Sequence, residues 1–240
     1  MNQGNDDAQG AVLDQTWLHL SALYEMLALS FAYPQERLAD AVVSGEYANA
    51  LLELVSINDI ADEVAAELDE SYSRREAHLP LRSGYTDMSV EKVEEALVAE
   101  YARMFIGAPT AVVPPYESAW IDFEDDYGEP DADVVQMVDN PDRAAAAAQW
   151  YRSCGLRIPE ESDEPLDHIA TELEFLQYLC GVMAGVMEPS GEAVITAEAY
   201  EGFRAEHILG WARRFAHGVM LKTHEPFYRM AAAILVALAS

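Results

Sequence analysis

The 240-residue sequence has little lysine and little positive charge. Lys92 and Lys222 are its only lysines, and its 43 acidic residues outnumber its 14 lysines and arginines, which gives a formal net charge of −29 at pH 7. Such a surface repels phosphate backbones, so the composition argues against a nucleic-acid-binding protein. Acidic residues spread over every segment favour a protein kept soluble in a very salty cytoplasm, where screening weakens their mutual repulsion.

Cysteines and long apolar runs are also scarce. Cys154 and Cys180 are the only cysteines and form no CxxC pair, which argues against a thiolate zinc site or a disulfide framework and suits a reducing compartment. Residues 1–15 have neither a basic start nor an apolar run, so they predict no secretory signal. No window approaches the roughly 18 apolar residues that a membrane helix requires. We therefore expect a cytoplasmic protein.

Helical periodicity is what the sequence does have. Apolar residues make up 51% of the chain, enough for a substantial core, and they recur at three- and four-residue steps along most of its length. Alternating strand patterns are scarce. The periodicity predicts an all-α fold, a helical bundle of about ten helices. The predicted helices lie at about 16–33, 35–55, 59–78, 89–106, 141–154, 165–187, 196–220 and 224–239.

Two segments interrupt this pattern. Residues 106–120, IGAPTAVVPPYESAW, contain one glycine and three prolines, which cannot continue a helix and keep the chain extended. Ordered connections of this length between helices are often functional. Residues 159–164 are polar and acidic and look like a hinge. We expect two packed halves that together form one compact domain, an N-terminal part (1–158) and a C-terminal part (165–240).

The common motifs of catalysis and metal binding are missing. None of the six histidines has a glutamate three residues before it, as a di-iron bundle requires, and HExxH is absent. GxSxG, GxxxxGK and GxGxxG are absent as well. His168 and Glu172 lie four residues apart, but this spacing is more typical of a contact within one helix. We expect neither enzyme activity nor a metal site.

Residues 162–179, SDEPLDHIATELEFLQYL, begin with unusual local chemistry. Pro165 suits the first turn of a helix, and Asp163 or Glu164 can cap the free amide groups of that turn. These features leave the Asp167–His168 pair unexplained. We interpret it as a hydrogen-bonding pair whose charge can respond to a ligand near neutral pH. The residues alone leave open a structural pair, an acid/base pair of an enzyme and a recognition site.

At this segment the sequence resembles the TorD/DmsD/NarJ family of cytoplasmic chaperones, which mature molybdenum-containing respiratory reductases. The family hallmark, E-P-x-D-H followed by xxxELxFMxxL, reads EPLDHIATELEFLQYL here. The resemblance extends to YEMLALSFAYP (24–34), YARMFIGAPTAVVPPYESAW (101–120), YRSCGL (151–156) and residues 207–238. Many relatives have tryptophan and glycine where this chain has Tyr116 and Glu117, so the loop departs from the family pattern there.

The resemblance implies a non-catalytic, system-specific chaperone. Its partner would be a molybdopterin oxidoreductase, and it would bind the twin-arginine leader, and in some relatives the mature part, during cofactor insertion and before export. We expect a partner of the DMSO/TMAO-reductase type; the alternative is an assembly factor for a nitrate or selenate reductase. The residues expected to bind the leader are Glu164, Pro165, Asp167, His168, Pro115, Tyr116, Ser118 and Trp120.

A twin-arginine leader offers two guanidinium groups followed by an apolar stretch, so its receptor needs an apolar groove with carboxylates at one end. Met104, Tyr116 and Trp120 are candidates for the groove, although a place in the core is an equal alternative for the two loop aromatics. The resemblance implies no required cofactor, with weak guanine-nucleotide binding in some relatives, and a monomer or a domain-swapped dimer. The candidate carboxylates are those of Glu117, Asp122, Glu164 and Asp167.

Overall fold

The fold is helical throughout the part of the chain that the structure describes. The computed structural model describes residues 6–74, 85, 87–107, 111–120, 141–158 and 165–240, which contain ten α-helices and no strand. The predicted all-α bundle of about ten helices is therefore confirmed. The helices are α1 (Asp6–Phe31), α2 (Glu36–Ser44), α3 (Glu46–Ile57), α4 (Ala61–Arg74), α5 (Val90–Tyr101), α6 (Pro141–Ser153), α7 (Ile169–Met183), α8 (Ala197–Phe203), α9 (Ala212–Lys222) and α10 (Pro226–Leu238).

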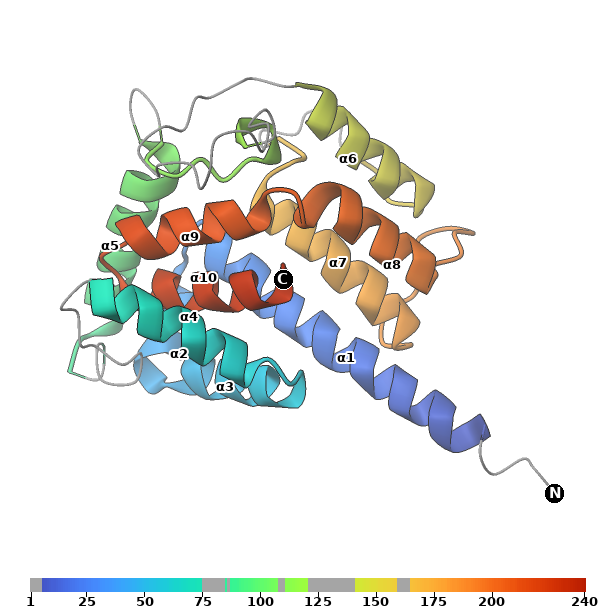
Figure 1. The fold of residues 1–240 in the computed structure, drawn as a ribbon, viewed down its shortest axis with the longest axis horizontal. Coiled ribbons are helices and arrows are strands. Elements are labelled where there is room, and N and C mark those ends of the chain that lie inside the picture. Colours follow the sequence, from blue (N-terminus) through green and yellow to red (C-terminus); the bar gives the residue numbers. More distant parts are fainter. Residues whose placement is uncertain (1–5, 75–84, 86, 108–110, 121–140, 159–164) are drawn as a thin grey trace.

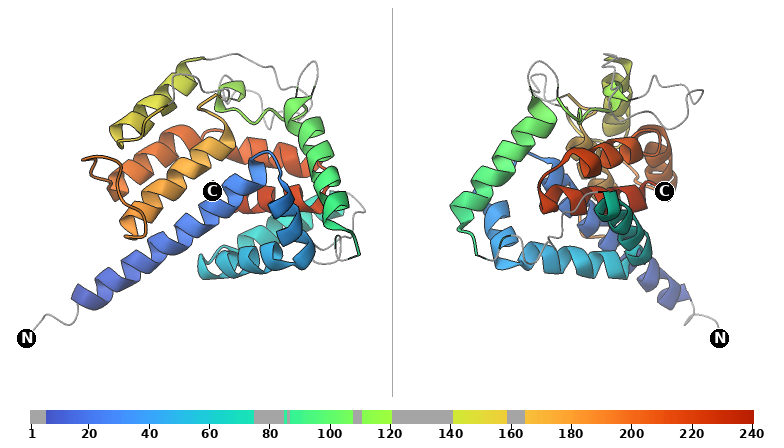
Figure 2. Two further views of the ribbon diagram at one scale, coloured as in Figure 1. Left: turned by 180° about the vertical axis from the view of Figure 1, so that it is seen from behind. Right: turned by 60° about the vertical axis from the view of Figure 1, so that its left-hand side comes forward.

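Helices from the two ends of the chain pack against each other. The long helix α1 lies along α7, and α4 packs on α10 (Figure 1). Figure 2 shows α5 crossing one end of the bundle, where it packs against α2. The predicted hinge at 159–164 lies outside the described residues, so the proposed division of the chain at that point stays a prediction. None of the described helices is both long and apolar enough to cross a membrane.

Aromatic side chains fill the centre of the bundle. Phe31 of α1 contacts Phe105 and Phe215 edge to face, with ring centroids 6.3 and 5.3 Å apart. These residues come from the first, middle and last thirds of the chain, and all three are buried. The hydroxyl groups of Tyr24 and Tyr200 hydrogen-bond over 2.8 Å, so even the buried phenols are paired. The core thus joins segments that are distant in sequence.

Several predicted helices are interrupted in the structure. The predicted helix at 35–55 is two helices, because Gly45 adopts a left-handed conformation (φ 79°) that ends α2. The predicted helix at 196–220 is interrupted as well, because α8 continues into a π-helical segment, η3 (Arg204–Ile208), before α9 begins. At that break the indole of Trp211 donates to the carbonyl of His207 over 2.6 Å. This bond occupies the acceptor that a regular helix would use.

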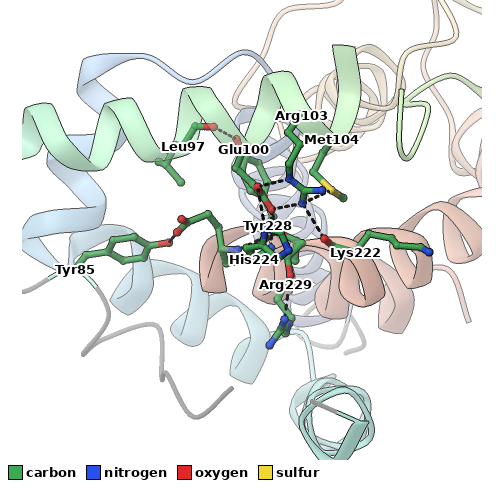
Figure 3. Close-up of polar contacts among 11 residues, drawn as sticks. Tyr85, Leu97, Glu100, Arg103, Met104, Lys222, His224, Tyr228 and Arg229 are labelled. Atoms are coloured by element: carbon green, nitrogen blue, oxygen red, sulfur yellow. Dashed lines mark hydrogen bonds and ion pairs between the residues drawn. The ribbon is translucent and has the colours of Figure 1, made fainter. Parts of the chain in front are cut away.

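A second π-helical segment, η1 (Ala102–Ile106), follows α5 where the sequence predicted one helix over 89–106. Here a buried carboxylate, Glu100, joins α5 to the turn between α9 and α10 (Figure 3). It accepts hydrogen bonds from Arg103 Nε (2.8 Å) and Nη2 (2.7 Å), Thr223 Oγ1 (2.9 Å) and the backbone N–H of His224 (2.6 Å). Burial opposes ionisation of Glu100, but these donors outweigh it and lower its pKa. We call Glu100, Arg103, Thr223 and His224 the Glu100 node.

Candidate functional site

The proline-rich loop and the hallmark segment are held together by a short backbone clasp. The Glu117 N–H donates to the Asp167 carbonyl (2.9 Å), and the Ile169 N–H donates to the Pro115 carbonyl (2.8 Å). Between these bonds, Tyr116 and His168 form an isolated antiparallel bridge. We use the term clasp for Pro115–Ser118 together with Asp167–Ile169. The clasp brings together most of the residues that the sequence marked for leader binding.

Side-chain bonds of Asp167 and Trp120 fix the shape of the loop. Asp167 Oδ2 accepts from the Ser118 N–H (3.0 Å) at the start of the 3-10 turn η2 (Glu117–Ala119). Such a bond satisfies an amide group that the turn itself leaves free. Trp120 Nε1 donates to the Pro114 carbonyl (2.9 Å) and closes the loop on itself. Helix α6 lies against η2 on the outer side (Figure 1).

His168 begins helix α7 rather than lying one turn inside a helix. The sequence predicted a helix from Pro165, but α7 starts at Ile169 and His168 is its N-cap, with an extended backbone (φ −73°, ψ 137°). His168 Nδ1 accepts from the Ala170 N–H over 3.1 Å. Burial lowers the pKa of His168 to about 4, against the raising effect of the Asp167 charge. His168 is therefore neutral near pH 7, and its capping nitrogen carries no proton.

The predicted hydrogen bond between Asp167 and His168 is wrong. Asp167 lies in a turn, which the His168 N–H closes on the Pro165 carbonyl, and its carboxylate accepts from Ser118, whereas the His168 ring accepts from Ala170. Both side chains are buried, with 2% of each residue exposed. Each of them therefore holds backbone in place.

The other predicted site residues divide between the core and the surface. Met104 and Trp120 are buried, so of the two alternatives for Trp120 the structure has the core position. Tyr116 is half-buried and lies edge-on to the His168 ring, with centroids 5.3 Å apart. Pro165 is exposed, Ser118 is half-buried and Pro115 is buried. Glu164 and Asp122 lie outside the described residues.

A buried polar cluster joins Glu117 of the clasp to two residues of the helical body. Glu117 of η2, Glu172 of α7 and His207 of η3 are completely buried, and their ligand atoms all lie within 4.8 Å of one another. His207 Nδ1 lies 2.8 Å from Glu117 Oε2. Trp211 Nε1 donates to Glu172 Oε2 over 3.2 Å. Sequence patterns did not reveal this cluster, because its members come from three separate segments and share no spacing motif.

The cluster is strongly acidic for a buried site. Burial raises the pKa of Glu172 well above its usual range, and the charges of Glu117 and Asp167 raise it further. Arg143 of α6 approaches Glu117 Oε1 only to 3.7 Å and keeps 30% of its side chain exposed. Glu117 Oε1, Glu172 Oε1 and His207 Nε2 have no hydrogen-bond partner among the described residues. Glu117 of the clasp thus belongs to a group of carboxyl side chains that the described part of the chain does not fully satisfy.

Comparison with known proteins places most of the chain in one family. The family model described as nitrate reductase delta subunit matches residues 61–217. A chaperone protein TorD of Vibrio cholerae serotype O1 is 25% identical over 50% of this chain and 48% of its own length. A Tat proofreading chaperone DmsD of Salmonella typhi is 26% identical over 57% of this chain and 55% of its own length.

A third relative is matched over more of its length. The chaperone protein TorD of Aliivibrio fischeri is 27% identical over 71% of both chains. Elsewhere the match is shorter, since the chain spans about half the length of the Vibrio cholerae and Salmonella relatives. The relatives are chaperones by name, and the family match covers the clasp and the cluster of Glu117, Glu172 and His207.

Proposed function

The chain belongs to the nitrate reductase delta subunit family and is similar to TorD and DmsD chaperones, and on that basis we propose that it is a system-specific maturation chaperone. It would bind the twin-arginine leader of a molybdopterin oxidoreductase in the cytoplasm while the cofactor is inserted. The observation that carries this proposal is the family match over residues 61–217, which includes the complete clasp. We propose a partner of the DMSO/TMAO-reductase type; the description of the family, nitrate reductase delta subunit, supports the alternative, a nitrate-reductase-type complex.

Within the clasp, we assign different roles to buried and accessible residues. Asp167 and His168 are positioning residues, because each is buried and its side chain accepts a hydrogen bond from a backbone N–H. Tyr116, Ser118 and Pro165 keep accessible surface and are the residues that would contact the leader. Ile106 and Val112, at the start of the same loop, expose 60% and 39% of their surface. They would receive the apolar part of the leader, since apolar contact supplies most of the affinity of such complexes in high salt.

The proposal is tested by calorimetric titration of the purified chain with leader peptides from the molybdopterin oxidoreductases of its source organism. Each peptide is paired with a version in which both arginines are lysines, which keeps the charge but removes the forked donor geometry. We expect one arginine peptide to bind and its lysine version to bind about tenfold more weakly. Equal affinity for both versions, or no binding by any leader, would contradict the proposal.

Variants separate positioning from a general loss of the fold. The double change Asp167→Ala with His168→Ala removes both capping acceptors, and we expect it to weaken leader binding while the helical circular dichroism stays largely intact. Asp167→Asn with His168→Asn keeps an acceptor at each position and should retain most of the affinity. Val194→Ser is the surface control, because Val194 is 84% exposed in the loop beyond the other end of α7. Equal losses in the alanine and asparagine pairs would refute the positioning role.

A further inference from the structure

Glu117, Glu172 and His207 present an arrangement of donor atoms that the chaperone proposal does not use. Each side chain is completely buried, and each comes from a different element: the clasp turn η2, helix α7 and the π-helical segment η3. One ligand atom from each lies within 4.8 Å of the other two. Short π-helical segments are frequent at functional sites, and η3 is the element that carries His207.

Within the part of the chain that the structure describes, three atoms of this cluster lack a hydrogen-bond partner. They are Glu117 Oε1, Glu172 Oε1 and His207 Nε2. A buried polar atom without a partner destabilises a fold by about 1–3 kcal/mol, and native proteins contain few of them. The two carboxyl groups cannot satisfy each other when both are ionised, because a carboxylate only accepts hydrogen bonds. Arg143 at 3.7 Å is too distant and too exposed to satisfy Glu117 by itself.

We propose that Glu117, Glu172 and His207 bind a divalent first-row transition cation, Zn²⁺ or an ion of similar ligand preference. Imidazole nitrogen and carboxylate oxygen are both ordinary ligands of such ions. Ligand atoms about 2.0–2.2 Å from one ion lie at most about 4.4 Å apart, so the observed separation of up to 4.8 Å requires only a small contraction. The cation would neutralise the two carboxylates and occupy the orphaned oxygens.

The surroundings of the three ligands suit this role. Trp211 Nε1 holds Glu172 Oε2 at 3.2 Å and leaves Oε1 for the ion. If His207 Nδ1, which now lies 2.8 Å from Glu117 Oε2, turns to the ion, then Nε2 carries the proton. Glu206 Oε1 lies 3.6 Å from Nε2, beyond hydrogen-bond distance, so it would have to move closer to accept a hydrogen bond from that proton. Carboxylate partners of this kind orient metal-bound histidines in known sites.

The bound cation would fasten the clasp to the helical body. Glu117 lies in the loop, whereas Glu172 and His207 lie on α7 and η3, so the ion would cross-link the three elements. This inference goes beyond the chaperone proposal and does not depend on it. Leader binding is measured with and without a chelator. Loss of the cation site does not by itself contradict leader binding, and absence of leader binding does not contradict the cation site.

The experiment uses the full chain, stripped with a chelator and titrated with Zn²⁺ alone in a calorimeter. Co²⁺ serves as the second probe, because its visible absorption reports ligand number and type. We expect one ion per chain, and each of Glu117→Gln, Glu172→Gln and His207→Gln should weaken binding by more than about tenfold. The control is Glu67→Gln, which alters a partly exposed Glu–His pair on the surface (Glu67 Oε2 to His217 Nε2, 3.3 Å) and should leave the affinity unchanged.

Two outcomes would overturn the proposal. One is the absence of saturable Zn²⁺ or Co²⁺ binding by wild-type chain that circular dichroism shows to be folded. The other is unchanged affinity in the Glu117→Gln and Glu172→Gln variants, which keep the side-chain volume and are expected to fold. Either result would mean that a proton shared by the two carboxyl groups balances the cluster without a cation.

Discussion

Glu100 and Glu172 are both buried acidic side chains on helices of the same bundle, yet their surroundings are opposite. Glu100 receives four hydrogen bonds, two of them from a guanidinium group (Figure 3). Among the described residues, Glu172 accepts a hydrogen bond from the Trp211 indole, and one close polar neighbour is a second carboxyl group, that of Glu117, which raises its pKa. The same burial therefore leaves the pKa of Glu100 lowered and the pKa of Glu172 raised.

The difference indicates which buried acid serves the fold and which is poised for another use. Donors that converge on a carboxylate recover the energy lost on desolvation and tie the elements together. Acids that converge on each other gain nothing from burial unless a proton or a cation joins them. The Glu100 node has the first arrangement and joins α5 to the α9–α10 turn. The cluster of Glu117, Glu172 and His207 has the second arrangement, and one of its members, Glu117, lies in the loop that the family resemblance marks as functional.

The largest effect is expected from removing the satisfied acid. Glu100→Ala removes the acceptor of the Thr223 hydroxyl and of the His224 N–H, and it leaves Arg103 with the Lys222 carbonyl but no carboxylate. Because Arg103 is partly exposed, we expect the unfolding free energy to fall by about 2–3 kcal/mol, below the full value for a buried pair. Urea unfolding measures this loss. The control is Glu95→Ala on the exposed face of α5; a loss no larger than that of the control would break the comparison.

The helices were predictable from the sequence, but the breaks and the buried cluster were not. Helical periodicity is a local signal, so it identified the segments whose apolar faces now line the core. The break at Gly45 depends on a left-handed conformation, and the break after His207 depends on the indole of Trp211 taking over a backbone carbonyl. Neither break changes the periodic spacing of apolar residues in the sequence. Motif searches for metal sites require fixed spacing, whereas Glu117, Glu172 and His207 meet only after the chain has folded.

The structural role of the hallmark residues was not predictable from the sequence. The sequence contained the exceptional Asp167–His168 pair, and it also contained the helix-start signals around Pro165. The actual start of α7 at Ile169 depends on the Pro115 carbonyl, which accepts from the Ile169 N–H, and on Ser118, whose N–H occupies Asp167. Both partners belong to a loop about fifty residues earlier, so local propensity cannot reveal them. Leader binding by these residues stays a prediction.

An intermediate effect, of opposite sign, is expected at the unsatisfied acid. In chelator, Glu172→Gln should raise the unfolding free energy by about 1 kcal/mol near neutral pH, because the amide can donate to Glu117 while its oxygen keeps the Trp211 bond. The pKa of Glu172 is higher in the folded than in the unfolded state. The wild type therefore loses stability as the pH rises from the unfolded-state pKa of Glu172 through its folded-state pKa. The advantage of the variant should therefore grow with pH. Urea unfolding over a pH series measures this stability difference. If the variant is less stable than wild type at every pH, Glu172 stabilises the fold as Glu100 does, and the contrast between them is refuted.

The smallest effect near neutral pH is expected at His168, where a polar group is buried but satisfied. Asparagine is a good N-cap, so His168→Asn should change the unfolding free energy by less than about 0.5 kcal/mol at pH 7. The folded-state pKa of about 4 lies below the ordinary value of 6.5, so the unfolded chain binds the extra proton first as pH falls. Wild-type stability from this residue is complete above the unfolded pKa and declines towards pH 4, by up to about 1.4 kcal/mol per unit.

The variant lacks this titration, so it should become the more stable protein as the solution is acidified. This direction is opposite to that expected for Glu172→Gln, whose advantage grows on the alkaline side. The two buried groups therefore act on the same clasp with opposite pH dependence, one because burial excludes a positive charge and the other because burial excludes a negative one. Parallel unfolding curves for wild type and His168→Asn between about pH 7 and pH 5 would show that His168 is not held neutral as the α7 cap requires.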